Sequence, residues 1–189
     1  MDTPASAILA ALYEGRRDSI ADGALSRPEE LDVFEAAALG VVERLASLLR
    51  ADPGLATSWT PDGFTPLHLA CFFGTTPAAQ IVVGVGADVN AVARNEMAVT
   101  PLHSAASAQN TPTCEVLIAA GADVNARQRG AVAPLHQAAH GGNQALVEAL
   151  IQAGADVEAK TDAGLTPANF AAEAGFTELA TTLEALAAS

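Results

Sequence analysis

The chain has 189 residues, of which 50% are hydrophobic but 4% aromatic, and its formal net charge is −13. A surface this acidic repels phosphate backbones and anionic headgroups, which argues against nucleic acids and membranes as binding partners. The start of the chain lacks the basic segment of a secretory signal, and there are two cysteines, Cys71 and Cys114. We therefore expect a cytoplasmic protein whose thiols are reduced.

Residues 1–59 predict two helix pairs that form a cap. The first helix of each pair ends at a glycine, and the two glycines, at positions 15 and 40, are 25 residues apart. This spacing leaves no room for a projecting turn between the pairs. Five of the nine basic residues precede residue 51, which suits the polar outer face of an end cap. The predicted helices are Ser6–Glu14, Arg17–Leu25, Leu31–Leu39 and Val42–Arg50.

An internal repeat begins near residue 60. The sequence Thr-Pro-Leu-His at Thr65–His68 returns at Thr100–His103, becomes Ala-Pro-Leu-His at Ala133–His136, and is weak at Thr166–Asn169. The prolines of these motifs are 35, 33 and 33 residues apart. A second motif, Gly-Ala-Asp-Val followed by Asn or Glu, keeps the same phase at residues 86–90, 121–125 and 154–158. Two motifs in constant phase indicate stacked copies of one supersecondary unit.

Each repeat predicts two helices and one exposed turn, which we call the finger. Threonine is a good N-cap and proline is favoured at the first helical position, so a short helix begins at each Thr-Pro. A glycine ends this helix nine residues after the threonine, except in the second copy, where Gln109 predicts a less relaxed turn. A second apolar helix follows, and a glycine in the left-handed conformation ends it. The last of these second helices is expected over Leu179–Ala188.

The repeat resembles the ankyrin repeat, whose period is about 33 residues and whose signature includes Thr-Pro-Leu-His-x-Ala. The resemblance implies an all-α ankyrin-repeat solenoid with antiparallel helix pairs and β-hairpin-like fingers. Together with the cap, we expect about six stacked helix pairs in one continuous domain. Two finger-less pairs would span residues 1–59, and four repeats, the last a C-terminal cap, would span about 60–92, 93–127, 128–160 and 161–189.

The repeated polar residues are interpreted as structural. His68, His103 and His136 occupy equivalent positions in successive units, so about 10 Å would separate them, too far for one metal ion with bonds of about 2 Å. The resemblance implies that this histidine forms hydrogen bonds within the turn. Cys71 and Cys114 fall at small apolar helix positions, which favours buried thiols. We therefore expect no catalytic residue, metal or cofactor.

The residues that do not repeat are the candidates for binding. The resemblance implies that finger tips, and the two residues before each helix-ending glycine, line the concave face. Phe72 and Phe73 hold this place in the first repeat, and two adjacent helical residues cannot both point inward. Trp59 and Phe64 flank the same finger, and aromatic side chains are enriched in binding hot spots. Alternatively, Trp59 and Phe64 seal the junction between the cap and the repeats.

Charge and length also vary among the fingers. All four basic residues after residue 51 lie on fingers, and a basic finger edge would suit a partner with an acidic rim. The alternative is that these turns simply tolerate basic side chains. The second finger holds two extra residues relative to the next two, and Met97 at its tip is either a contact point or sequence drift. The basic residues are Arg94, Arg127, Arg129 and Lys160.

The sequence therefore predicts a protein-interaction module that binds a partner protein through its concave groove and fingers and is monomeric on its own. One alternative is a structural or self-associating protein. The other is an enzyme or small-molecule binder, for which His140, Glu173 and the finger arginines are candidates, although they lie on different units. The predicted partner-binding residues are Trp59, Phe64, Phe72, Phe73, Arg94, Met97, Arg127, Arg129 and His140.

Overall fold

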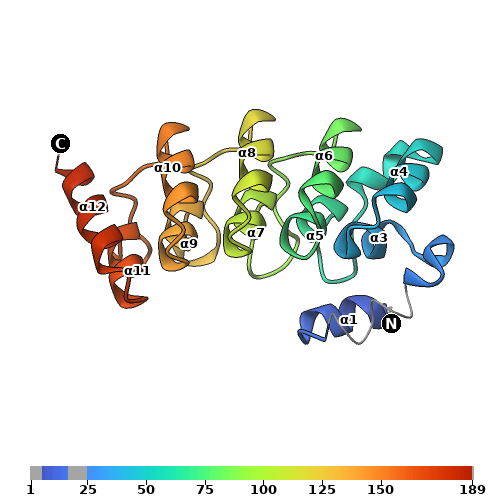
Figure 1. Cartoon of the computed structure of the whole chain (residues 1–189), viewed down its shortest axis with the longest axis horizontal. Coiled ribbons are helices and arrows are strands. Elements are labelled where there is room, and N and C mark those ends of the chain that lie inside the picture. The colour runs from blue at the N-terminus through green and yellow to red at the C-terminus, as the bar shows by residue number, and fades with distance from the viewer. Residues whose placement is uncertain (1–5, 17–24, 189) are drawn as a thin grey trace.

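The computed structural model describes residues 6–16 and 25–188, and every regular element in these ranges is a helix. Five antiparallel helix pairs stand side by side in one row (Figure 1). Short 3-10 helices occur at Pro28–Glu30, Pro53–Thr57 and Arg129–Ala131. The pairs are α3 (Val33–Leu39) with α4 (Val42–Ala51), α5 (Pro66–Phe72) with α6 (Thr76–Gly84), α7 (Pro101–Ser107) with α8 (Thr111–Ala119), α9 (Pro134–His140) with α10 (Gln144–Gln152), and α11 (Pro167–Glu173) with α12 (Thr177–Ala187).

The helices begin as the Thr-Pro motif predicts. The Thr65 and Thr100 hydroxyls accept hydrogen bonds from the backbone N–H of the histidine three residues later, both at 3.4 Å. This contact satisfies one of the donors that a helix start leaves without an intrahelical partner. At the other end of each unit, the predicted left-handed glycines have φ values of 92°, 90° and 92° at positions 86, 121 and 154. Both ends of the predicted unit are confirmed.

Gln109 takes the place of the helix-ending glycine in the second repeat, and the expected strained turn is present. Its φ is +54°, in the left-handed region that a residue with a side chain rarely adopts. Its amide donates to the carbonyls of Ala106 at 2.8 Å and Gln137 at 2.9 Å. The same amide fills the space that a side chain at Gly141 would need. The third repeat thus accommodates the departure in the second.

The fingers form a connected row but contain no strand within the described residues. In the second and third fingers a backbone hydrogen bond closes the turn, from Ala93 N–H to Val99 O at 2.8 Å and from Gln128 N–H to Val132 O at 3.0 Å. Another bond joins each of these fingers to the one before, as from Arg129 N–H to Met97 O at 3.0 Å. The fingers are therefore linked turns, and the implied β-hairpins have no strand ladder here.

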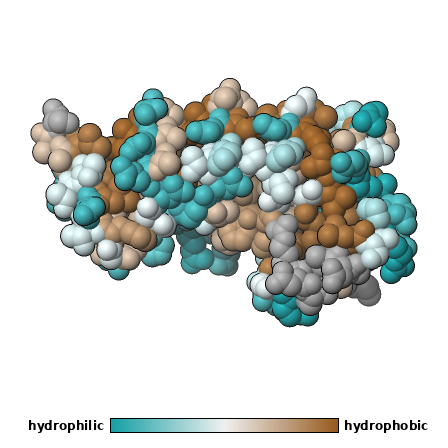
Figure 2. Space-filling view, viewed as in Figure 1, coloured by the Kyte–Doolittle hydropathy of each residue, from teal (hydrophilic) through white to brown (hydrophobic). Residues whose placement is uncertain are grey.

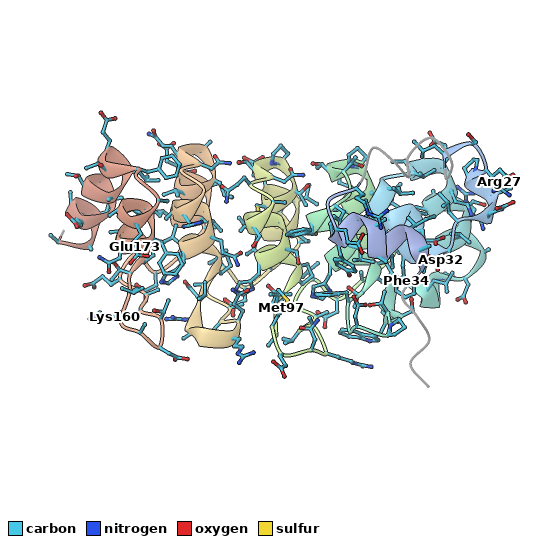
Figure 3. The ribbon with its side chains drawn as sticks, turned by 90° about the horizontal axis from the view of Figure 1, so that it is seen from below. Arg27, Asp32, Phe34, Met97, Lys160 and Glu173 are labelled. Carbon is cyan, nitrogen blue, oxygen red and sulfur yellow. The ribbon has the colours of Figure 1, made fainter. Side chains whose placement is uncertain are left out.

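The N-terminal cap differs from the expected arrangement. Helices α3 and α4 form the predicted second pair. Helix α1 (Ala7–Tyr13) does not extend the row but lies across the first helices of the neighbouring pairs, α3 and α5 (Figures 1 and 3). Leu9 and Leu12 of α1 are buried in the common core. Tyr13 reaches past α3 and packs on Phe73 of the first repeat, with ring centroids 5.3 Å apart. The predicted helix over Arg17–Leu25 falls almost entirely on residues 17–24, outside the described ranges.

Candidate functional site

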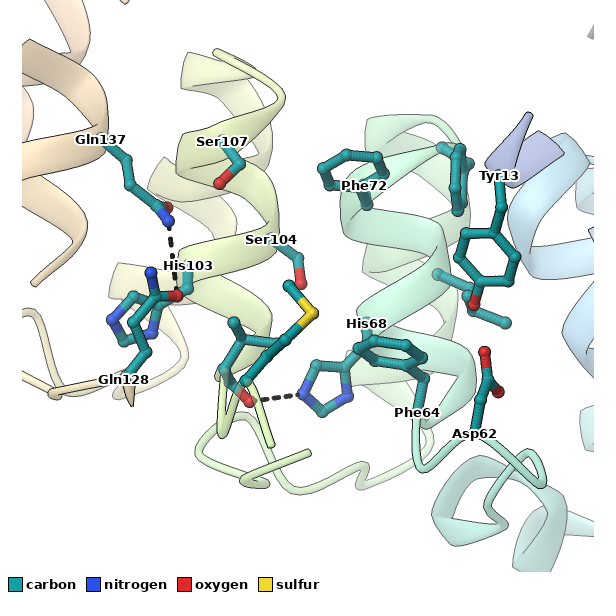
Figure 4. A pocket seen from close by; sticks show the side chains of 14 residues that line it. Tyr13, Asp62, Phe64, His68, Phe72, His103, Ser104, Ser107, Gln128 and Gln137 are labelled. Atoms are coloured by element: carbon teal, nitrogen blue, oxygen red, sulfur yellow. Dashed lines mark hydrogen bonds between the residues drawn. The ribbon is translucent and has the colours of Figure 1, made fainter. Parts of the chain in front are cut away.

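An open groove of about 390 Å³ lies beside α1, on the inner helix face, which is the face formed by the first helix of each pair. It runs from α1 over α5 and α7 to α9 and is lined mainly by apolar atoms (Figure 4). On the surface, apolar side chains gather near α3, whereas the surface over α9 and α10 is more hydrophilic (Figure 2). The residues that line the groove include Tyr13, Asp62, Phe64, Phe72, Phe73 and Met97.

Aromatic rings form the N-terminal wall of the groove. Phe72 and Phe73 stack edge to face with centroids 4.7 Å apart, and Tyr13 lies 6.4 Å from Phe64. Phe73 is partly buried against the core, whereas 47% of the Phe72 surface is exposed. This arrangement confirms that at least one of the two adjacent phenylalanines faces solvent. Phe72, together with the 43% exposed Tyr13, is thus a ring of this wall that another molecule can cover.

The second finger contributes Met97, whose exposed fraction is 55%. The Asn95 side chain accepts from Met97 N–H at 3.0 Å and donates to the Asp62 carbonyl of the neighbouring finger at 2.9 Å. These two hydrogen bonds of Asn95 hold the finger tip in place and leave the Met97 side chain exposed. The thioether is flexible and polarizable, so it can adapt to an apolar ligand.

Asp62 is the one charged side chain among the residues that line the groove. It is partly buried, and its Oδ1 has no hydrogen-bond partner among the described residues. The Tyr13 hydroxyl faces this carboxylate (Figure 4). The pKa of Tyr13 is raised by burial first, and then by hydrogen bonding to Asp62 and by its negative charge. Tyr13 therefore stays a neutral donor beside an ionisable carboxylate.

Polar side chains form the opposite end of the groove. Ser104 and Ser107 project from α7, and Gln137 projects from α9 toward Gln128 of the third finger (Figure 4). The Gln137 amide donates to Gln128 Oε1 at 3.4 Å, and its own Oε1 is buried without a partner within the described residues. These groups add hydrogen-bonding capacity but no charge.

The repeated histidines are structural, as the sequence indicates. His68 Nδ1 accepts from Thr65 N–H at 3.3 Å, so the proton resides on Nε2, which donates to the Val99 carbonyl of the next finger at 3.0 Å. His103 repeats both contacts with Thr100 and Val132. Each histidine thus joins a helix start to the following finger. Among the described residues, no group of three or more His, Cys, Asp or Glu could hold a metal ion.

Comparison with known families agrees with this geometry. A model of ankyrin repeats in three copies matches residues 33–128, and a second model of many copies matches residues 135–184. Together the two matches cover well over half of the chain. The chain belongs to the ankyrin-repeat family.

One curated relative of this ankyrin-repeat chain is a rice protein (Oryza sativa subsp. japonica) named "Probable E3 ubiquitin-protein ligase XBOS31". The two are 38% identical over 69 residues, which is 36% of this chain and 16% of the relative. The chain therefore spans a small part of that protein's length. The similarity extends over a segment of about two repeat periods.

The structure brings together four of the predicted site residues of the ankyrin-repeat protein: Phe64, Phe72, Phe73 and Met97 all line the groove. Trp59 does not line it. Instead, Trp59 lies beneath Arg94, whose guanidinium carbon is 4.1 Å from the ring centroid. His140 is also outside the groove, with its ring centroid 6.3 Å from that of Phe170.

The finger arginines of the ankyrin-repeat protein are engaged within the chain. Arg127 donates to the carbonyls of Ala131 at 2.7 Å and Lys160 at 2.8 Å. Arg129 pairs with Glu96 of the preceding finger, N to O, at 2.8 Å. The contacts with Lys160 and Glu96 link adjacent fingers, and neither arginine lines the groove.

Several groove residues lie outside the predicted partner-binding set, among them Tyr13 and Asp62. Asp62 lies in a Pro-Asp-Gly sequence that is typical of an exposed turn, so nothing in the sequence alone distinguishes it from other finger acids. Tyr13 lies two residues before the helix-ending Gly15, as Phe72 lies two residues before Gly74 in the first repeat. This equivalence with Phe72 is the sequence feature that indicates a place for Tyr13 on the same face.

The two cysteines of the ankyrin-repeat protein are free and buried. Burial raises the pKa of Cys114 to about 12 and that of Cys71 well above its ordinary range. A thiol reacts as its thiolate, so both are poor nucleophiles.

No helix in the described ranges is long and apolar enough to cross a membrane.

Proposed function

We propose that this ankyrin-repeat protein is a non-catalytic module that binds a partner protein through the groove on its inner helix face. The exposed pair of Phe72 and Met97 carries the proposal, because these two large apolar side chains both line the groove and both remain exposed to solvent. Exposed apolar patches rimmed by polar groups mark sites of protein interaction.

The contacts of the groove favour affinity. Tyr13 packs on both Phe64 and Phe73 in the free chain, so the wall is largely preformed. A preformed surface loses little conformational entropy on binding. The groove is also open and mainly apolar, whereas catalysis requires clustered polar groups with shifted ionisation.

The net charge of the chain and its two free thiols favour a protein as the partner. A net charge of −13 disfavours nucleic acids and anionic membranes. Two free thiols fit the reducing cytoplasm. The finger arginines serve neighbouring fingers, so the proposed binding rests on the groove rather than on a basic finger edge. The ligase activity named for the rice protein is not part of the proposal, since the match covers 16% of that protein.

An affinity pull-down from the native source tests the groove. The wild-type chain and Phe72→Glu would be compared, because Phe72 is exposed and its replacement leaves the core intact. Val85→Glu is the matched control, an exposed apolar residue at the end of the outer helix α6. We expect Phe72→Glu to lose a partner that the control retains. A folded Phe72→Glu chain that keeps every partner contradicts the groove assignment.

A further inference from the structure

We propose that the segment bound in the groove pairs an apolar side chain with a lysine or arginine. The apolar side chain would lie between Phe72 and Met97, and the cation would approach the Asp62 carboxylate. This inference rests on the proposed function and adds the chemistry of the partner.

Charge complementarity is the first argument. Asp62 brings a carboxylate to a mainly apolar groove, and one of its oxygens is buried without a hydrogen-bond donor among the described residues. A partly buried charge without a counter-charge is unfavourable. In residues 6–16 and 25–188 the ion pairs are Arg16–Glu14, Arg27–Glu30 and Arg129–Glu96, so none of them involves Asp62. A cation supplied by a partner would provide the missing counter-charge.

The other groups around the groove do not compete for this role. His68 and His103 line the groove but are neutral near pH 7, because burial lowers the pKa of each. The Tyr13 hydroxyl offers Asp62 a neutral donor, which leaves the negative charge in place. The nearest finger arginine in sequence, Arg94, stacks on Trp59. The field within the groove therefore favours a positive ligand group.

The size of the groove and its position beside α1 are the second argument. A volume of about 390 Å³ admits a few side chains of a partner. Helix α1 already rests on the same face, with Leu9 and Leu12 buried and Tyr13 forming the groove wall. The groove thus continues an interface that a short apolar helix of the chain already makes. A second short segment, contributed by a partner, fits beyond Tyr13.

A selection from random twelve-residue peptides displayed on phage provides the probe. The full chain would be the bait, and peptides that also bind Phe72→Glu would be removed as ligands of other surfaces. We expect the remaining peptides to be enriched in lysine or arginine at a fixed spacing from an aromatic or aliphatic residue. Enrichment of acidic or uncharged peptides overturns the inference while leaving the groove as a binding site.

A double-mutant cycle on the best selected peptide then tests the contact itself. Fluorescence polarisation would measure the Kd of the peptide and of its Lys→Gln or Arg→Gln form for the wild type and Asp62→Asn. We expect each single change to weaken binding about tenfold or more, and both together little further, because a charge-assisted contact is lost only once. Higher salt should weaken binding of the basic peptide to the wild type more than to Asp62→Asn.

The matched control is Asp162→Asn, which removes an equal charge from the exposed fourth finger, outside the groove. It should leave the Kd within about twofold, since an exposed charge acts weakly at a distance. Equal losses for Asp62→Asn and Asp162→Asn would show a general charge effect and overturn the inference. If no selected peptide depends on Phe72, both the inference and the proposed function are contradicted.

Discussion

At the scale of single residues, the histidine of each repeat connects that repeat to the next. His68 holds Thr65 through Nδ1 and the next finger through Nε2, and 1% of its surface is exposed. The last repeat has Asn169 at this position, and Asn169 Oδ1 accepts from Thr166 N–H at 2.9 Å. Asparagine thus keeps the local contact but cannot reach further. Histidine thus occurs in the three repeats that are followed by another finger, and its Nε2 contacts a backbone carbonyl of that finger.

Because of these histidines, we expect the free energy of unfolding to decrease as pH falls below about 6.5. Burial lowers the pKa of His68 from 6.5 to about 4, and lowers those of His103 and His136. The unfolded chain therefore binds more protons between these values, and the stability present above pH 6.5 is lost as pH falls toward 4. Urea unfolding at pH 7.5 and 5.5 should show a loss of about 1 kcal/mol from His68 alone.

The variant His68→Asn isolates the effect. It retains the type of cap found at Asn169 but loses the bond to Val99, so we expect it to be about 1–3 kcal/mol less stable at pH 7.5. Its stability should also change less between pH 7.5 and 5.5 than that of the wild type. An unchanged pH dependence would mean that His68 does not titrate with folding.

At the scale of elements, three first helices carry a threonine N-cap while α9 starts from Ala133 without a side-chain cap. The backbone there is nevertheless the same: φ and ψ are −96° and 162° at Ala133, against −96° and 167° at Thr100. Both residues are buried, at 2% and 4% exposed. The third repeat is therefore shaped for a hydroxyl that it lacks.

Ala133→Thr should stabilise the chain by about 1 kcal/mol, because the new hydroxyl can accept from the backbone N–H of His136. Ala133→Val is the matched control, since valine has nearly the shape of threonine without the hydroxyl. Thermal or urea unfolding of both variants measures the difference. Equal stability of the two variants would show that shape, and not the cap, decides this position.

The repeat made most elements predictable. Helices α5, α7, α9 and α11 begin at the prolines that the motif marks, and α12 begins at Thr177, two residues before the expected start. The periodic pattern reports contacts between equivalent positions of neighbouring units. The position of α1 and the groove depends on contacts that occur once, such as Tyr13 on Phe73. Such contacts leave no periodic trace, so the crosswise α1 and the place of Asp62 were not predictable.

At the scale of the whole molecule, a strongly acidic chain presents an apolar groove large enough to hold several side chains of a partner. The exposed ring of Phe72 could pair with a second copy, which is the self-association that the sequence leaves open. Two copies would each bring a charge of −13 to the contact. Like charges of this size oppose close approach, and salt weakens the opposition.

We therefore expect a monomer of 19.1 kDa in solution. Light scattering over a concentration series, at about 0.01 M and about 0.5 M salt, separates charge repulsion from a lack of complementarity. A constant monomer mass in both salts leaves the groove free for another protein. A mass that rises with concentration in high salt, and returns to the monomer value in Phe72→Glu but not in Val85→Glu, would instead identify the groove as a contact between copies.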